Sequence, residues 1–211
     1  MKKISNIIFS ICFSILIITG IIKFTVGFRE LYYYDINKLN IETLSNLSEE
    51  EIILNYDYLI DYNLGKADKN FEMPTIKSSP QGKIHFEEVR DIFQNINKLF
   101  NLCLIISIVG LFINIKCKNI KFLNITSKSL ISIPIILALP IVINFEGSFV
   151  IFHKLMFSND YWIFDPNLDP VIDMLPQQFF FHAGVMILSL ILVSSILMYM
   201  VYRLLNAKRE Q

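Results

Sequence analysis

Three histidines are the side chains in this sequence that are best suited to proton-transfer chemistry. Imidazole is the group whose unperturbed pKa lets it take up and release a proton near neutral pH. At the start of a helix the dipole disfavours the imidazolium form, which would leave a neutral base. Each histidine can also be an ordinary interfacial side chain, and the residue type alone leaves both interpretations open. The three residues are His85, His153 and His182.

A zinc site is the second kind of chemistry that these residues allow. Glu87, Glu88 or Asp165 could supply oxygen ligands beside the histidines. The sequence contains no HExxH or CxxC spacing, no GxSxG segment and no P-loop. We therefore expect no metal, no cofactor, and no serine or cysteine nucleophile supplied by the protein.

A predominantly apolar chain has to position the histidines. Hydrophobic residues make up 54% of the 211 residues and charged residues 18%, whereas a soluble domain averages about 45–50% and about 25%. Four apolar runs approach the roughly 20 residues that a helix needs to cross a bilayer. The third run contains two prolines and is a little short, but its helix could continue past Glu146 towards Phe152. The runs lie at residues 4–22, 99–115, 130–145 and 179–202.

The first run reads as an uncleaved anchor rather than a signal peptide. Its apolar stretch is longer than the usual signal region, and no small-residue cleavage site follows it. With four spans, the N-terminus, the loop and the C-terminal tail share one side and carry nine basic residues and one acidic residue. The segments on the other side carry nine basic and 18 acidic residues. This asymmetry predicts cytoplasmic termini and three histidines on the extracytoplasmic side. The formal net charge is zero, and we expect no nucleic-acid partner.

The first extracytoplasmic segment is too long and too regularly patterned for a plain loop. Ser48 and Glu51 form a capping-box pattern, and apolar residues then follow helical spacing as far as Gly65. Residues 71–76 read as a short strand, and the next helix is expected to begin near His85. In the second segment, Asp169 and Pro170 are expected to cap a short helix over residues 171–175.

The predicted fold is an α-helical integral membrane protein with four transmembrane helices and a small mixed α/β extracytoplasmic cap. The transmembrane helices occupy residues 1–26, 99–115, 130–145 and 179–202. The cap occupies residues 27–98, the extracytoplasmic interfacial segment 146–178, the cytoplasmic loop 116–129 and the cytoplasmic tail 203–211.

Several stretches of the sequence resemble the lipoprotein intramolecular transacylase (Lit) family. They are residues 85–93 (HFEEVRDIF), Phe152 with His153, residues 159–166 (NDYWIFDP) and residues 169–180. The motif at residues 159–166 is more specific than the one at residues 85–93, because it is long and contains unusual residues in a fixed order. The four-span layout is similar too, so the resemblance covers essentially the whole chain.

The resemblance implies a bacterial plasma-membrane acyltransferase that acts on diacylglyceryl-modified lipoproteins. It would move the sn-2 acyl chain onto the α-amino group of the N-terminal cysteine, giving the lyso form. The family is thought to use two histidines, which would be His85 and His153. We expect His85 to act as the base and His153 to stabilise the oxyanion or protonate the leaving oxygen, although the two roles can be exchanged.

Three further residues are candidates for supporting roles at this site. Asp165 would orient a histidine, Asn159 would donate to the oxyanion, and Trp162 lies in the same motif. His182 has no role that the resemblance assigns. The alternative function is a non-enzymatic membrane partner or sensor whose acidic extracytoplasmic cap binds another protein.

Overall fold

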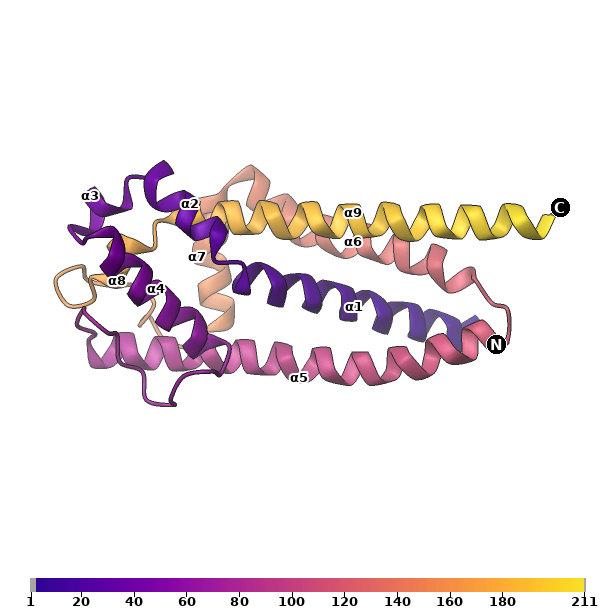
Figure 1. The fold of residues 1–211 in the computed structure, drawn as a ribbon, viewed down its shortest axis with the longest axis horizontal. Coiled ribbons are helices and arrows are strands. Elements are labelled where there is room, and N and C mark those ends of the chain that lie inside the picture. Colours follow the sequence, from indigo (N-terminus) through magenta and orange to yellow (C-terminus); the bar gives the residue numbers. More distant parts are fainter. Residues whose placement is uncertain (1–2, 211) are drawn as a thin grey trace. The chain divides into compact units, whose positions relative to one another are not determined.

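The computed structural model describes residues 3–210, except for the side chains of residues 3, 133 and 136–142. Within this part of the chain every regular element is an α-helix, and no strand is present (Figure 1). The helices are α1 (Lys3–Gly27), α2 (Glu30–Lys38), α3 (Ile41–Ser45), α4 (Glu49–Asn63), α5 (Pro80–Lys116), α6 (Lys121–Ile143), α7 (Phe145–Met156), α8 (Val171–Met174) and α9 (Gln177–Glu210).

Among the described residues, three helices are long and apolar enough to cross a membrane: α1 from Ile4, α5 and α9. At most 22% of the residues in their most apolar stretches are buried inside the protein, as is typical of surfaces that face lipid. The fourth expected span, 130–145, overlaps the second half of α6, and half of its residues have side chains outside the described part. The count of four therefore stays a prediction.

The chain divides into two compact units. The apolar unit comprises the described residues of Met1–Phe24, Ile96–Leu139 and Val185–Gln211. The histidine unit comprises Thr25–Asn95 and Pro140–Gly184, and it contains all three histidines.

Inside the apolar unit, aromatic rings and small polar groups join the helices. Phe9 stacks on Phe13, and both pack edge-on against Phe122 of α6. The Asn119 amide donates to Asn6 (3.0 Å) and to Asn114 (2.6 Å), so it links the loop before α6 to α1 and α5. Paired amides of this kind satisfy polar groups that an apolar solvent cannot.

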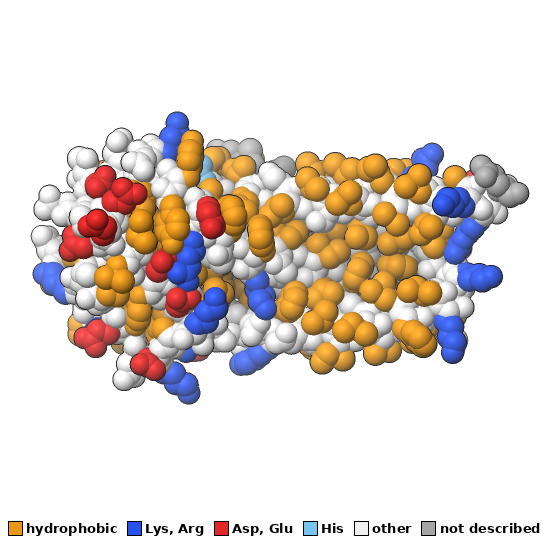
Figure 2. All heavy atoms as spheres, in the orientation of Figure 1, with side chains coloured by type: hydrophobic (Ala, Val, Ile, Leu, Met, Phe, Trp, Pro, Cys, Tyr) orange, Lys and Arg blue, Asp and Glu red, His pale blue; other side chains and the backbone are white. Residues whose placement is uncertain are grey.

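The basic residues of the apolar unit gather where these helices end. The Arg209 guanidinium near the end of α9 donates to the Lys118 carbonyl in the α5–α6 loop. Figure 2 shows hydrophobic side chains over the visible part of this unit, with lysine and arginine at its helix ends. The visible part of the histidine unit carries aspartates and glutamates among lysines and arginines. That unit holds 18 acidic and eight basic residues, so the acidic side chains are concentrated in it, whereas the side of the membrane that it faces stays a prediction.

An aromatic core holds the histidine unit together. Tyr32 stacks on Tyr56 with ring centroids 3.7 Å apart, and Phe179 meets both rings edge-on. The Tyr32 hydroxyl donates to the Met174 carbonyl at 2.6 Å, so α2 is held to α8. Burial of such large rings, with the hydroxyl satisfied, is the main source of stability for a unit of this size.

The predicted start and end of α4 are confirmed. The Ser48 hydroxyl accepts from the Glu51 amide, and the Glu51 carboxylate accepts from the Ser48 amide. Gly65, just beyond the helix, has φ +75°, the left-handed conformation that glycine adopts without strain.

The predicted α/β composition of the cap is wrong, because residues 71–76 form no strand. Phe71 and Met73 are both buried, so the alternation that suggested a strand does reflect an inward-facing edge. The segment has no partner strand, however, and side chains of α4 take up its backbone amides. Glu72 N donates to the Tyr58 hydroxyl (2.7 Å), and Thr75 N donates to the side chain of Asn55 (3.2 Å).

Helix α5 begins five residues earlier than expected. Ser79 is its N-cap, since its hydroxyl accepts from the Gly82 amide (2.9 Å), and Pro80 takes the first helical position. The buried Asp169 carboxylate accepts from both the amide and the hydroxyl of Ser79, each at 2.7 Å. A Cβ at Gly82 would lie 2.3 Å from this carboxylate. The start of α5 therefore depends on a residue 90 positions away.

Two further helix ends differ from the sequence-based expectation. The helix of the third apolar run does not continue past Glu146. It stops at Ile143, and Asn144, in an extended conformation, caps the separate helix α7 through the Gly147 amide. The short helix α8 forms as expected, ending at Met174, but Asp169 binds Ser79 instead of capping it.

Candidate active site

Two of the three histidines lie side by side in the histidine unit. His85 comes from the second turn of α5 and His153 from the last turn of α7, with ring centroids 6.2 Å apart. His85 is 5% exposed, and its Nδ1 is buried without a hydrogen-bond partner. A buried imidazole nitrogen with no partner is costly, and sites that keep one commonly use it on a substrate.

Aromatic rings enclose the pair. Two of them pack on His85 at centroid distances of 4.7 and 5.4 Å, and two pack on His153 at 4.2 and 4.8 Å. These rings shield His85 from water almost fully and His153 in part, without accepting hydrogen bonds from them. They belong, in that order, to Phe157, Phe164, Phe149 and Trp162.

Both imidazoles are neutral at pH 7. Burial lowers the pKa of His85 from 6.5 to about 4, and the nearby His153 lowers it further. Burial also lowers the pKa of His153, against an opposing contribution from its hydrogen bond to the Phe149 carbonyl. His85 is the sixth residue of α5, in the charged part of that helix and beyond its first turn. Burial, and not the expected helix dipole, therefore keeps it neutral.

The tautomer of His153 follows from its hydrogen bond. Its Nδ1 lies 2.7 Å from the Phe149 carbonyl oxygen, which can only accept. Nδ1 therefore carries the proton, and the lone pair of the neutral ring is on Nε2. A backbone carbonyl on one nitrogen both fixes the ring and increases the basicity of the other nitrogen.

The three predicted supporting residues have different positions. Trp162 lies against His153, and its buried Nε1–H has no hydrogen-bond partner. The Asn159 amide donates to Glu88 at 2.8 Å, so it already has an acceptor within the protein. Asp165 is exposed, and its carboxylate accepts twice from Asn167. The structure thus brings Trp162 and Asn159 to the site, whereas Asp165 shapes a surface turn and orients neither histidine.

Sequence reasoning did not single out the pairing of His182 with a buried carboxylate in this unit. His182 Nδ1 lies 2.8 and 2.9 Å from the two carboxylate oxygens of Asp35, which is fully buried. Asp35 is three residues from Tyr32 and adjacent to Ile36, both fully buried, so it lies on the apolar face of α2. A carboxylate on an apolar helix face was the signal that could have revealed it.

This arrangement of two neutral imidazoles can accept and donate protons. The side chains that pack against the two imidazoles are aromatic, and no group of three or more metal-binding side chains is present among residues 3–210. Proton transfer of this kind suits a substrate that brings its own nucleophile. Fold and site together define a helical, membrane-integral protein with an enclosed pair of neutral imidazoles.

The comparison with protein families identifies the chain. The profile of the family described as lipoprotein intramolecular transacylase Lit matches residues 7–180. The chain belongs to this family, and it is accordingly an acyltransferase that works by transacylation. None of the curated protein sequences matches the chain.

Solved structures agree over the full length. The chain is similar to the membrane-integral lipoprotein intramolecular transacylase Lit from Bacillus cereus, with 44% identity, a TM-score of 0.91, and coverage of 97% of this chain and 96% of that one. Structures of the Bacillus cereus protein with the H85R and H85A mutations give 42% identity and TM-scores of 0.88 and 0.89. They cover 99% of this chain and 93% and 94% of theirs.

Proposed function

We propose that the chain moves the sn-2 O-acyl chain of a diacylglyceryl-cysteine lipoprotein onto the α-amino group of the same cysteine. The observation that supports this reaction is the enclosed pair of neutral imidazoles in a member of the Lit family. A substrate that carries both the ester and the attacking amine needs no nucleophile from the protein. Holding the two groups together contributes much of the rate, since intramolecular geometry is worth roughly 7–11 kcal/mol.

The reaction balances without a co-reactant. The amine nitrogen bonds to the ester carbonyl carbon, and the carbonyl oxygen becomes an oxyanion. The attacking nitrogen becomes acidic and gives a proton to a histidine. The bond between the carbonyl carbon and the sn-2 oxygen then breaks, and that oxygen takes up the proton that the histidine accepted, so both imidazoles end neutral. The products are an amide and a free glyceryl hydroxyl within one molecule.

Geometry favours an exchange of the two histidine roles expected from the sequence. His153 is the base, because its Nδ1–H is bound to the Phe149 carbonyl and its Nε2 lone pair is available. His85 stays neutral and uses an N–H to stabilise the oxyanion and the leaving oxygen. The unpartnered indole N–H of Trp162 is a second donor for the oxyanion.

The site faces the extracytoplasmic side of a bacterial plasma membrane in this proposal. Four helices cross the bilayer, both termini are cytoplasmic, and the domain boundaries follow those predicted from the sequence. Support comes from the basic ends of the apolar unit, because lysine and arginine tend to remain in the cytoplasm. The partners are diacylglyceryl-modified lipoproteins, which bring both lipid and N-terminal peptide.

A defined lipopeptide tests the reaction. The full-length protein in detergent is mixed with a synthetic diacylglyceryl-cysteine peptide, and tandem mass spectrometry locates the acyl chains, because substrate and product have the same mass. We expect one acyl chain to move to nitrogen. His85→Ala and His153→Ala should each slow the transfer by about 10²–10⁴-fold.

Asp165→Asn is the matched control, since it can keep the surface turn and should transfer at the wild-type rate. Full conversion by both histidine variants would refute the two-histidine site. A wild-type protein that leaves the peptide unchanged would favour the alternative of a non-enzymatic partner or sensor.

A further inference from the structure

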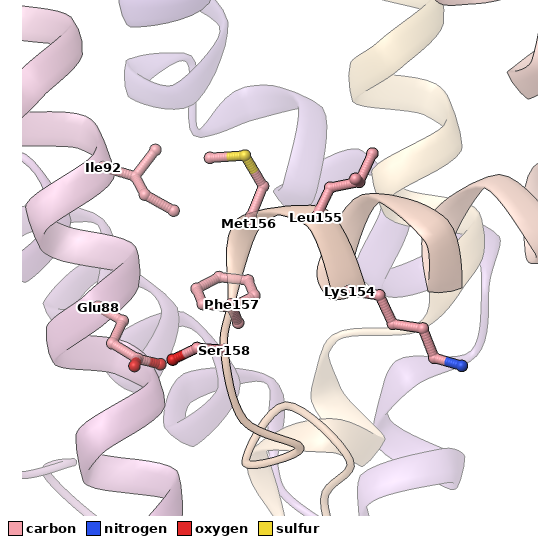
Figure 3. Close-up of a pocket in the computed structure, with 7 residues that line it drawn as sticks. All are labelled: Glu88, Ile92, Lys154, Leu155, Met156, Phe157 and Ser158. Carbon is pink, nitrogen blue, oxygen red and sulfur yellow. The ribbon is translucent and has the colours of Figure 1, made fainter.

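A pocket of about 400 Å³ opens beside the histidine pair (Figure 3). It is lined by Glu88 and Ile92 of α5 and by residues 154–158 of α7 and the following loop. Phe157 connects the pocket to the histidine pair, because it lines the pocket and packs on the His85 ring with centroids 4.7 Å apart. Glu88 is three residues after His85, so both side chains project from the same face of α5.

Glu88 is the only carboxylate among the residues that line this pocket, and it is held in place without being neutralised. Its Oε1 accepts from the Asn159 amide at 2.8 Å, whereas its Oε2 is buried with no hydrogen-bond partner. None of the ion pairs between described residues involves Glu88. Figure 3 shows the Lys154 ammonium directed away from it. A buried carboxylate oxygen of this kind requires a hydrogen-bond donor or a cation.

We propose that Glu88 binds the α-ammonium group of the lipoprotein's N-terminal cysteine, which makes this pocket the amine subsite of the enzyme. The proposal rests on the proposed function, which requires a free amine beside the histidines. An unperturbed α-amino group has a pKa of about 7.7–8.0, so it arrives mostly as a cation. One of its three N–H groups can donate to the unsatisfied Oε2 of Glu88, in a charge-assisted hydrogen bond.

The remaining walls fit the rest of that residue. Ile92, Met156 and Phe157 offer apolar surface for the thioether and the glyceryl methylene groups. An ammonium bound to Glu88 would lie about one helical turn, roughly 5 Å, from His85 along α5. The amine would then wait next to the imidazole pair before it loses its proton and attacks.

Binding of unreactive lipopeptides separates this proposal from the reaction itself. Two analogues carry an ether in place of the sn-2 ester; one has a free α-amine and the other an N-acetyl group. We expect the wild-type protein to bind the free-amine analogue about tenfold or more tightly than the acetylated one, as a charge-assisted hydrogen bond allows. Glu88→Gln should remove this preference. Glu87→Gln is the matched control, because Glu87 is the neighbouring, exposed carboxylate, and it should keep the preference.

Equal binding of the two analogues by the wild-type protein would overturn the proposal without any variant. A preference that survives Glu88→Gln, in a variant with the wild-type unfolding temperature, would overturn it as well. Either result leaves the proposed function intact as long as the wild-type protein converts the ester lipopeptide. Failure of that conversion would instead remove the proposed function.

Discussion

The half-buried His182 binds the fully buried carboxylate of Asp35 and joins the start of α9 to α2. The imidazole Nδ1 approaches both carboxylate oxygens, at 2.8 and 2.9 Å, and no part of Asp35 is exposed. A carboxylate removed from water is stable only while its partner remains. The pair therefore adds to the aromatic core of the histidine unit a contact between residues 147 positions apart.

Replacing one residue of this pair should lower the free energy of unfolding more than replacing both. His182→Leu leaves the Asp35 carboxylate buried and unpaired, so we expect a loss of about 3–5 kcal/mol in the free energy of unfolding. The double variant Asp35→Asn/His182→Leu removes the charge as well and should be more stable than His182→Leu alone. Thermal unfolding of both in the same detergent measures the difference. A double variant that is less stable than His182→Leu would contradict the role assigned to the pair.

A glycine in α5 allows a close approach between two helices of the apolar unit. A Cβ at Gly110 would lie 2.2 Å from the Phe9 ring, which is buried between Phe13 and Phe122. Gly110→Ala should therefore lower the stability by about 1–3 kcal/mol through overpacking. Gly184→Ala, also in a helix but with no atom near the new methyl group, is the control and should be neutral or slightly stabilising. Unfolding temperatures that fall equally for both variants would rule out the clash.

Local sequence patterns predicted helix ends correctly where residues close in the sequence determine the structure. The capping box of Ser48 and Glu51 and the left-handed Gly65 involve contacts within a few residues, so their residue types are sufficient. The start of α5 is different, because the Asp169 carboxylate that holds Ser79 comes from a distant segment.

The candidate site shows the same division. The motifs identified His85, His153 and the neighbouring Trp162, and the structure places these three together, but no pattern indicated which phenylalanine rings would surround them. The pairing of Asn159 with Glu88 likewise depends on how α5 meets the loop after α7. Such contacts join segments about 70 residues apart, so they follow from tertiary packing and not from spacing along the chain.

The low pKa of His85 makes stability depend on pH. The unfolded chain binds a proton at this residue near pH 6.5, whereas the folded chain does so only near pH 4. Folding is therefore opposed increasingly as the pH falls from 6.5 to 4, by up to roughly 3 kcal/mol, and is unaffected above pH 7. His85→Asn should lose less stability than the wild-type protein over this interval. Unfolding temperatures of the two proteins at pH 7 and pH 4.5 measure the effect, and parallel changes would show that His85 does not titrate there.

Trp162 can support the reaction in two ways that a pair of variants distinguishes. Its ring packs on His153 at 4.8 Å, and its buried N–H has no partner in the protein. Trp162→Phe keeps an aromatic ring against His153 but is smaller than the indole, and it removes the donor. If the indole N–H stabilises the oxyanion, this variant should lower kcat by about 10²–10³-fold with little change in KM. Trp162→Leu removes the ring as well and should lower kcat further. A Trp162→Phe enzyme with wild-type kcat would show that the residue acts by packing alone, because this variant has no N–H to donate.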